Sequence, residues 1–197
     1  MNLRHFLHPL LLSAFILFAN LAYGGEESLA SIKDRLLIET AFITGLGTSK
    51  IPECHYQPVL LIYHLGIDLK KYFPKMKDWK GSFSSYLEPQ FNPVMDPETD
   101  FEFGIGLGVQ YTHPLTDRLS AYISGSVGPH YISLVTVDQA NGFIFSDTVG
   151  GGLYFFLTKK SAINLGYRLR HMSNAGPAKP NHGIDTHFGV IGWSIFF

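Results

Sequence analysis

Apolar and polar residues alternate with a period of two along most of the chain. The clearest stretch is 101–112, where odd positions are apolar and even positions are small or polar. Its apolar positions are Phe101, Phe103, Ile105, Leu107, Val109 and Tyr111. Successive side chains of a β-strand point to opposite faces, so this stretch predicts a strand whose two faces meet different surroundings.

Eight segments carry this pattern, six of them clearly and two of them less cleanly. The clear segments are 79–91, 101–112, 118–128, 143–157, 161–173 and 185–197, and the weaker ones are 36–47 and 58–69. In the clear segments the apolar side chains take the odd numbers. An even number of antiparallel strands of about ten residues can close a sheet without edges and cross a bilayer. The pattern therefore predicts an all-β fold, an eight-stranded antiparallel transmembrane β-barrel.

The lengths of the connecting segments agree with this fold. Residues 113–117 and 158–160 are short, as periplasmic turns are, whereas 48–56, 92–100, 130–142 and 174–184 are longer, as outer loops are. The segment 70–78 is the exception because it is long for a periplasmic turn.

A soluble β-sandwich or lipocalin-like barrel is the alternative, and its apolar faces would point inward. The glycine-rich polar face suits the narrow interior of an eight-stranded barrel better than a sandwich core. Buried charges could pair there, and the candidates are Glu88, Glu102, Arg168 and Arg170. Phe197 ends an alternating last strand, which resembles the C-terminal signature of bacterial outer-membrane proteins. These features favour the membrane barrel.

The N-terminus has the pattern of a secretory signal peptide. A basic start is followed by an apolar stretch over 10–18 and by the small residues of Ala22-Tyr23-Gly24. An uncleaved anchor would need about 20 uninterrupted apolar residues. We expect residues 1–24 to be the signal peptide and residues 25–197 to be the barrel domain. The 15 basic residues of the whole chain nearly balance its 16 acidic ones, so nucleic acid is not an expected partner.

Two polar side chains continue the outward row of segment 161–173, where apolar residues are expected. They are His171 and Ser173, and Asp185 starts the next segment with the same parity. An i, i+2 pair on one face lies about 7 Å apart, which allows a histidine to act as a base for a serine. An acid beside the histidine would complete a nucleophilic site. The alternative is that all three are rim residues that contact lipid headgroups.

The residues around this pair resemble the motif of a known family. Residues 170–176 read Arg-His-Met-Ser-Asn-Ala-Gly, and residues 181–185 read Asn-His-Gly-Ile-Asp. They are similar to the H-x-S-N-A motif and the downstream acid of the PagL family, the outer-membrane lipid A 3-O-deacylases. The resemblance implies that His171 is the catalytic base, Ser173 the nucleophile and Asp185 the acid. Family members usually have glutamate at the position of Asp185.

The resemblance also implies supporting roles and a substrate. It implies an oxyanion role for Asn181 and the Gly176 region, with Asn174 supporting the site. The implied substrate is lipid A of lipopolysaccharide among the lipids of the outer membrane, and the implied reaction hydrolyses the ester of its 3-hydroxyacyl chain at the 3 position. No cofactor or metal is expected, and the nearby His182 and His187 are interpreted as rim residues.

Two other functions remain open at this point. The same residues could serve a phospholipase that acts on another membrane lipid. A small structural or adhesive barrel would instead use its outer loops, although the loops here are short for an adhesin. The sequence leaves open whether the protein is a homodimer.

Overall fold

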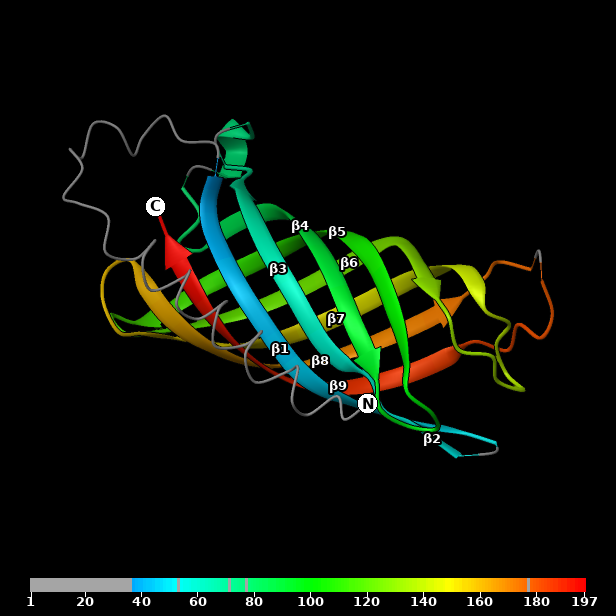
Figure 1. Ribbon diagram of the computed structural model, residues 1–197. Helices are drawn as coiled ribbons and strands as arrows, with labels where there is room; N and C mark the ends of the chain where they lie inside the picture. Colours follow the sequence, from blue (N-terminus) through cyan, green and yellow to red (C-terminus); the bar gives the residue numbers. More distant parts are fainter. Residues whose placement is uncertain (1–36, 53, 71, 77, 177) are drawn as a thin grey trace. The chain divides into compact units, whose positions relative to one another are not determined.

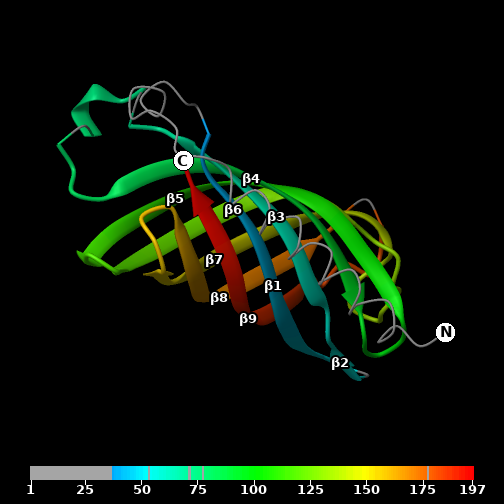
Figure 2. The same ribbon diagram turned by 60° about the vertical axis from the view of Figure 1, so that its left-hand side comes forward.

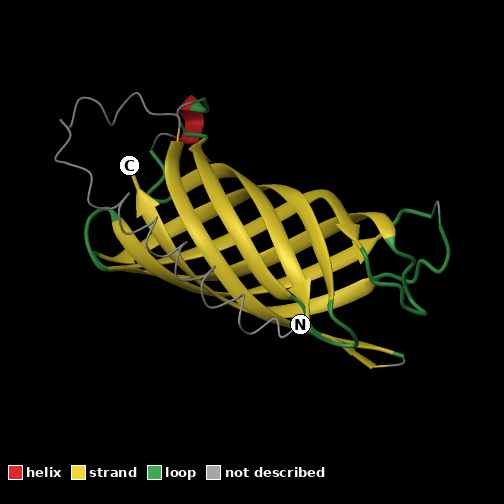
Figure 3. Cartoon of the chain, viewed as in Figure 1, coloured by secondary structure: helices red, strands yellow, loops and turns green. Residues whose placement is uncertain are grey.

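The computed structural model describes residues 37–197 except 53, 71, 77 and 177, and within these residues nine antiparallel strands form one sheet (Figures 1 and 3). They are β1 (Leu37–Ile51), β2 (Cys54–Tyr56), β3 (Val59–Asp68), β4 (Ser82–Val94), β5 (Asp100–Thr116), β6 (Leu119–Ile132), β7 (Gly142–Phe156), β8 (Ser161–Ser173) and β9 (Ile184–Phe196). Eight of these strands close the barrel, since each pairs with the next along the chain and β9 returns to pair with β1. The short β2 pairs with the end of β1. The predicted eight-stranded antiparallel barrel is confirmed. The predicted signal peptide, 1–24, lies outside the described residues.

The strands are strongly inclined to the barrel axis, as the view in Figure 2 shows. Inclination of this kind is required to close eight strands into a barrel. The segment 70–78, which is long for a turn, contains the short 3-10 helix η1 (Pro74–Met76). In the described part of the chain, no helix is long and apolar enough to cross a bilayer.

Several strand boundaries differ from the sequence prediction, mostly near the outer loops. β4 begins at Ser82 instead of residue 79, and β6 continues to Ile132 instead of residue 128. The predicted loop 48–56 is largely strand, because the end of β1 pairs with β2 from Ser49–Tyr56 to Ile51–Cys54. The extensions of β1 and β6 pair backbone to backbone beyond the region where an alternating pattern of side chains marks a strand, whereas β4 starts three residues later than predicted.

The outward parity predicted for the clear segments holds, but β1 has the opposite parity. Odd-numbered Leu107, Ile123, Val127 and Val149 are exposed on the outer wall. In β1 the odd-numbered Ala41 and Ile43 are buried inside the barrel, while Leu46 is 72% exposed. Both faces of β1 carry apolar side chains, since its inward residues pack in a cluster with residues of β3 and β9. This explains why its alternation is weak in the sequence.

Charged side chains fill the middle of the barrel and are paired. Arg168 donates two hydrogen bonds to the Glu88 carboxylate, at 2.6 and 2.8 Å. Arg170 donates to Glu102 at 2.7 Å, and the Tyr56 hydroxyl donates to the same carboxylate at 2.9 Å. The pairing predicted for these four charges is confirmed. The ion pairs in the middle of the barrel and the apolar side chains along its outer wall exclude the soluble alternative, whose outer wall would be polar.

An apolar cluster closes the interior above these charges, at the end where the 133–141 and 174–183 loops lie. Its members, all buried, are Ile51, Tyr56, Val94, Ile132, Leu134, Ile144, Met172 and Ile184. Met172 lies between His171 and Ser173 in β8, and Ile184 precedes Asp185 in β9. The inward side chains next to the predicted site residues are therefore held in a packed core, which fixes the backbone that carries the site.

Candidate active site

His171 and Asp185 face each other across neighbouring strands on the outer wall. They are direct register partners in the β8–β9 ladder, and directly opposed residues share one face of a sheet. The Nδ1 atom of His171 lies 2.7 Å from Oδ1 of Asp185, and the two side chains are 45% and 71% exposed. A carboxylate at Nδ1 favours the tautomer with the proton on that nitrogen, which leaves Nε2 free to accept a proton.

Ser173 lies two residues beyond His171 on the same outward face of β8. It is partly exposed, and its register partner in β7 is Phe145. Among the described residues no hydrogen bond joins Ser173 to His171. Bonds of this type often become short only when a substrate is bound, so this spacing is compatible with proton transfer between the two side chains.

Asn174 organises the loop that follows Ser173. The side chain is buried, with its Nδ2 donating to the carbonyl of Ala178 at 2.8 Å and its Oδ1 accepting the N–H of Gly176 at 2.9 Å. Its own N–H donates to Oδ1 of Asn181 at 2.8 Å. The loop needs these restraints because Ala175 and Gly176 both have positive φ, 56° and 104°. Asn174 thus links the other two residues predicted to support the site.

These contacts distinguish the two candidate oxyanion donors. The Oδ1 atom of Asn181 is used by the Asn174 N–H, which leaves its amide nitrogen as the part of that side chain able to donate to a ligand. The N–H of Gly176 already donates to Asn174. A second loop braces Asn181, which bridges to Gln139, and the His182 N–H donates to the Asp138 carbonyl at 2.7 Å.

Gly183 contacts the imidazole of His171, which the sequence interpretation missed. Its φ is +82°, a conformation that favours glycine, and a Cβ atom there would lie 2.5 Å from Cε1 and 3.1 Å from Nε2 of His171. The only signal in the sequence is a glycine two residues before the predicted acid. Because the missing Cβ leaves room for the ring, Gly183 is a candidate for positioning His171.

Asp147 is a second outward carboxylate near His171 that the sequence interpretation did not single out. It is exposed and pairs with His171 in the β7–β8 ladder, on the side away from Asp185. Its odd position within segment 143–157 was the available signal. Of the two carboxylates, Asp185 is the one hydrogen-bonded to the imidazole, so geometry favours Asp185 as its acid.

The two neighbouring histidines lie at the rim. His187 bonds through Nδ1 to the Tyr167 hydroxyl on the outer wall, and His182 is exposed. Within the described ranges, no group of three or more His, Cys, Asp or Glu side chains is arranged to hold a metal ion.

Aromatic side chains form an outward band beside the site. Their rings contact one another in a series that comprises Phe91, Phe101, Phe103 and Tyr131, with Phe143 packed against Phe145. Phe145 is the register partner of Ser173, so the band reaches the site. Aromatic girdles of this kind mark the boundary between hydrocarbon and headgroups on membrane barrels.

The fold and the site define a barrel of the outer-membrane kind with a serine and a histidine–aspartate pair on its outer wall. The chain belongs to the PagL family, described as lipid A 3-O-deacylase, whose family model matches residues 62–194. No curated protein sequence matches the chain.

Solved structures with the same fold include an enzyme and proteins of other kinds. The crystal structure of the outer membrane enzyme PagL is 17% identical, with 81% of this chain and 99% of that chain covered and a TM-score of 0.56. Neisserial surface protein A is 10% identical, with 81% and 97% covered and a TM-score of 0.59. The N-terminal barrel domain of Pseudomonas aeruginosa OprF is 11% identical, with 83% and 98% covered and a TM-score of 0.50. At these identities they show the fold alone.

Proposed function

We propose that the chain is a lipid A 3-O-deacylase of the outer membrane that works by a serine–histidine–aspartate mechanism. The observation that carries this proposal is the 2.7 Å contact between His171 and Asp185, with Ser173 on the same outward row. All three residues lie inside the region matched by the family. A serine needs a base and the base needs a fixed tautomer, and the pair supplies both requirements.

The reaction follows from these positions. Nε2 of His171 takes the proton of Ser173 as the hydroxyl oxygen attacks the acyl carbonyl, and Asp185 stabilises the imidazolium that forms. The tetrahedral oxyanion accepts a hydrogen bond from the amide nitrogen of Asn181. When the intermediate collapses, the sugar oxygen leaves with the proton from His171. Water, deprotonated by the same histidine, then cleaves the acyl-serine and releases the 3-hydroxy fatty acid.

Gly176 has a secondary place in this proposal. Its N–H can join the oxyanion site only by sharing or releasing the bond to Asn174. Asn174 itself acts by holding the loop, because its backbone N–H, Nδ2 and Oδ1 are all engaged within residues 174–181. We therefore assign the first oxyanion contact to Asn181.

The aspartate, which replaces the usual glutamate, fits its position. His171 and Asp185 are directly opposite in the ladder, where side chains of an antiparallel pair come close. The shorter carboxylate reaches Nδ1 at 2.7 Å without an additional methylene. This contact supports Asp185 as the acid.

The outward position supports a substrate that is itself part of the membrane. Ser173 lies beside Phe145 at the aromatic band, on the wall that faces lipid in a membrane barrel. A lipid in the outer leaflet can reach it sideways without leaving the bilayer.

We further propose that residues 1–24 are removed on export, so that the mature chain starts at Gly25.

The test is mass spectrometry of lipid A from cells that express the chain. The wild type should remove one 3-hydroxyacyl chain, and Ser173→Ala and His171→Ala should leave lipid A unchanged. Ser85→Ala is the matched control, because Ser85 is a partly exposed serine in β4, away from the site. Unchanged lipid A with the wild-type barrel folded in the outer membrane would refute the proposal. Fatty acid released from phospholipid instead would identify a phospholipase.

A further inference from the structure

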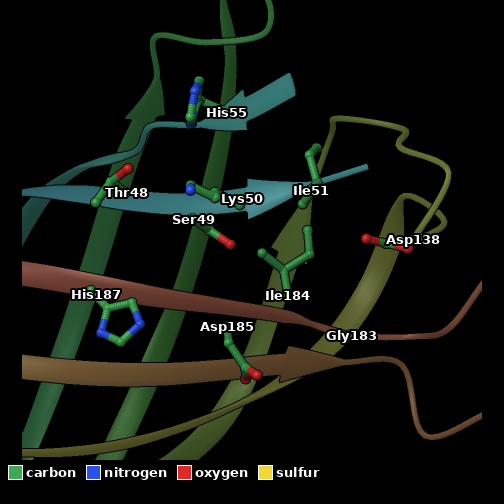
Figure 4. Close-up of a pocket in the computed structure, with 10 residues that line it drawn as sticks. All are labelled: Thr48, Ser49, Lys50, Ile51, His55, Asp138, Gly183, Ile184, Asp185 and His187. Carbon is green, nitrogen blue, oxygen red and sulfur yellow. The ribbon is translucent and has the colours of Figure 1, made fainter. Parts of the chain in front are cut away.

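The ladder between β1 and β9 ends before either strand does. Its last pair is Thr48–His187, although β9 begins at Ile184 and β1 continues to Ile51. Above this pair β1 turns to a different partner, β2, and Lys50 lies opposite His55. The two barrel strands therefore separate at the outer end, and a pocket of about 510 Å³ occupies the space beside them (Figure 4).

Seven of the ten residues that line this pocket have polar or charged side chains, and the lining comes from four parts of the chain. It consists of Thr48, Ser49, Lys50 and Ile51 from β1, His55 from β2, Asp138 from the 133–141 loop, and Gly183, Ile184, Asp185 and His187 from and before β9. Lys50 and His55 are exposed, and Lys50 forms no ion pair with any residue that the structure describes. Its positive charge is available to a ligand.

We propose that this pocket binds the phosphorylated sugar of the lipid substrate while the acyl ester lies at Ser173. The inference rests on the proposed deacylase function and identifies what holds the headgroup. An ammonium group and imidazoles suit a phosphate, whereas carboxylate and hydroxyl oxygens suit sugar hydroxyls. The volume lies in the range of pockets that enclose one small ligand.

The pocket shares a wall with the reacting groups. Asp185 lines it and also holds His171, and Gly183 lines it and contacts the same imidazole. Neighbouring strands are about 5 Å apart, so a ligand between β1 and β9 is one or two strand spacings from the row of Ser173 on β8. A single sugar can span this interval and present its ester to the serine.

The charges in the pocket also predict how the sugar is oriented. Asp185 and Asp138, the two carboxylates of the pocket, come from β9 and from the 133–141 loop and not from the β1–β2 hairpin. Lys50 and His55 both come from that hairpin. The phosphate therefore lies on the hairpin side, and the hydroxyls face the carboxylates.

The experiment compares Lys50→Gln with the wild type on two substrates in mixed micelles, phosphorylated lipid A and the same lipid with its phosphates removed. A lysine near an anionic headgroup contributes enough binding for about a five-fold change in affinity. We expect KM for the phosphorylated lipid to rise about five-fold with kcat unchanged, and no change with the dephosphorylated lipid. Lys50→Arg should restore the wild-type KM.

Lys179→Gln is the matched control, because Lys179 is an exposed lysine of the neighbouring 174–183 loop that does not line the pocket. It should leave both KM values unchanged. If Lys50→Gln leaves KM unaltered, or alters it equally for the two lipids, the pocket assignment is wrong while the deacylase function stands. If the folded wild type releases no 3-hydroxy acid from either lipid, the proposed function itself fails.

Discussion

Replacing Gly183 with alanine would place a methyl group against the imidazole of His171. The new Cβ would lie 2.5 Å from Cε1 and 3.1 Å from Nε2, whereas carbon atoms in contact are normally about 3.5–4.0 Å apart. One of the two must therefore move by about 1 Å, which is the difference between these distances. Gly183 is part of the backbone that leads into β9, so the side chain of His171 is the part free to move.

The displacement affects the atoms that the proposed mechanism uses. Nδ1 of His171 would lose its 2.7 Å contact with Asp185, or Nε2 would turn away from Ser173. A misplacement of about 1 Å can cost about 100-fold in rate. We expect kcat of Gly183→Ala to fall about 100-fold, with KM for lipid A changed little because the methyl group leaves most of the binding surface intact.

Strain in the backbone is a separate effect and needs its own control. An alanine at φ +82° costs about 1–2 kcal/mol of stability wherever it occurs. Gly142 has φ +102°, and nothing lies within 4 Å of the place that a Cβ would take there, so Gly142→Ala carries similar strain without the contact. Both variants should lose similar stability in urea unfolding, and only Gly183→Ala should lose activity. A folded Gly183→Ala enzyme with more than half of the wild-type kcat would refute the positioning role.

Three other predictions test the acid and the interior. Asp185→Glu should keep its kcat within about ten-fold of the wild type, whereas Asp185→Asn, which cannot stabilise the imidazolium, should lose about 100-fold or more. Equal activity of the two variants in kinetic assays would contradict the role of the negative charge. Asp147→Asn should change kcat less than about two-fold because the imidazole of His171 is bonded to Asp185 instead, and a ten-fold loss in the same assay would assign Asp147 a catalytic contribution. Glu88→Ala leaves the guanidinium of Arg168 buried and unpaired, so the free energy of unfolding in urea, measured in lipid vesicles, should fall by about 3–5 kcal/mol. The double variant Glu88→Leu/Arg168→Met should recover most of this loss. A single variant as stable as wild type would show that the ion pair does not contribute to stability.

The alternation of side chains was sufficient to predict the barrel because it reports the surroundings of each strand separately. Strands β5, β6 and β7 divide an apolar set from a small or polar set, and each keeps the predicted face outward. β1 shows the limit of this reasoning. Its inner face packs apolar side chains such as Ile43 beside Phe188, so neither parity is marked, and only pairing with β3 and β9 fixes which face is inside.

For the candidate site too, the sequence was sufficient to predict one part and the tertiary structure was needed for another. The sequence alone determined that His171, Ser173 and Asp185 share one outward face, since parity and one antiparallel hairpin are local properties of β8 and β9. It could not determine the contact of Gly183 with His171, because that depends on the conformation of a loop held by Asn174 and by a second loop.

Only the tertiary structure showed the pocket between β1 and β9. Lys50 and Asp185 are at opposite ends of the described chain, and they line one pocket because the barrel closes β9 onto β1. The local pattern determined the strands and the face on which the reacting groups lie. The closure of the barrel, the point where its last ladder ends and the packing of its outer loops decided what lies beside those groups, since these depend on contacts between residues far apart in the chain.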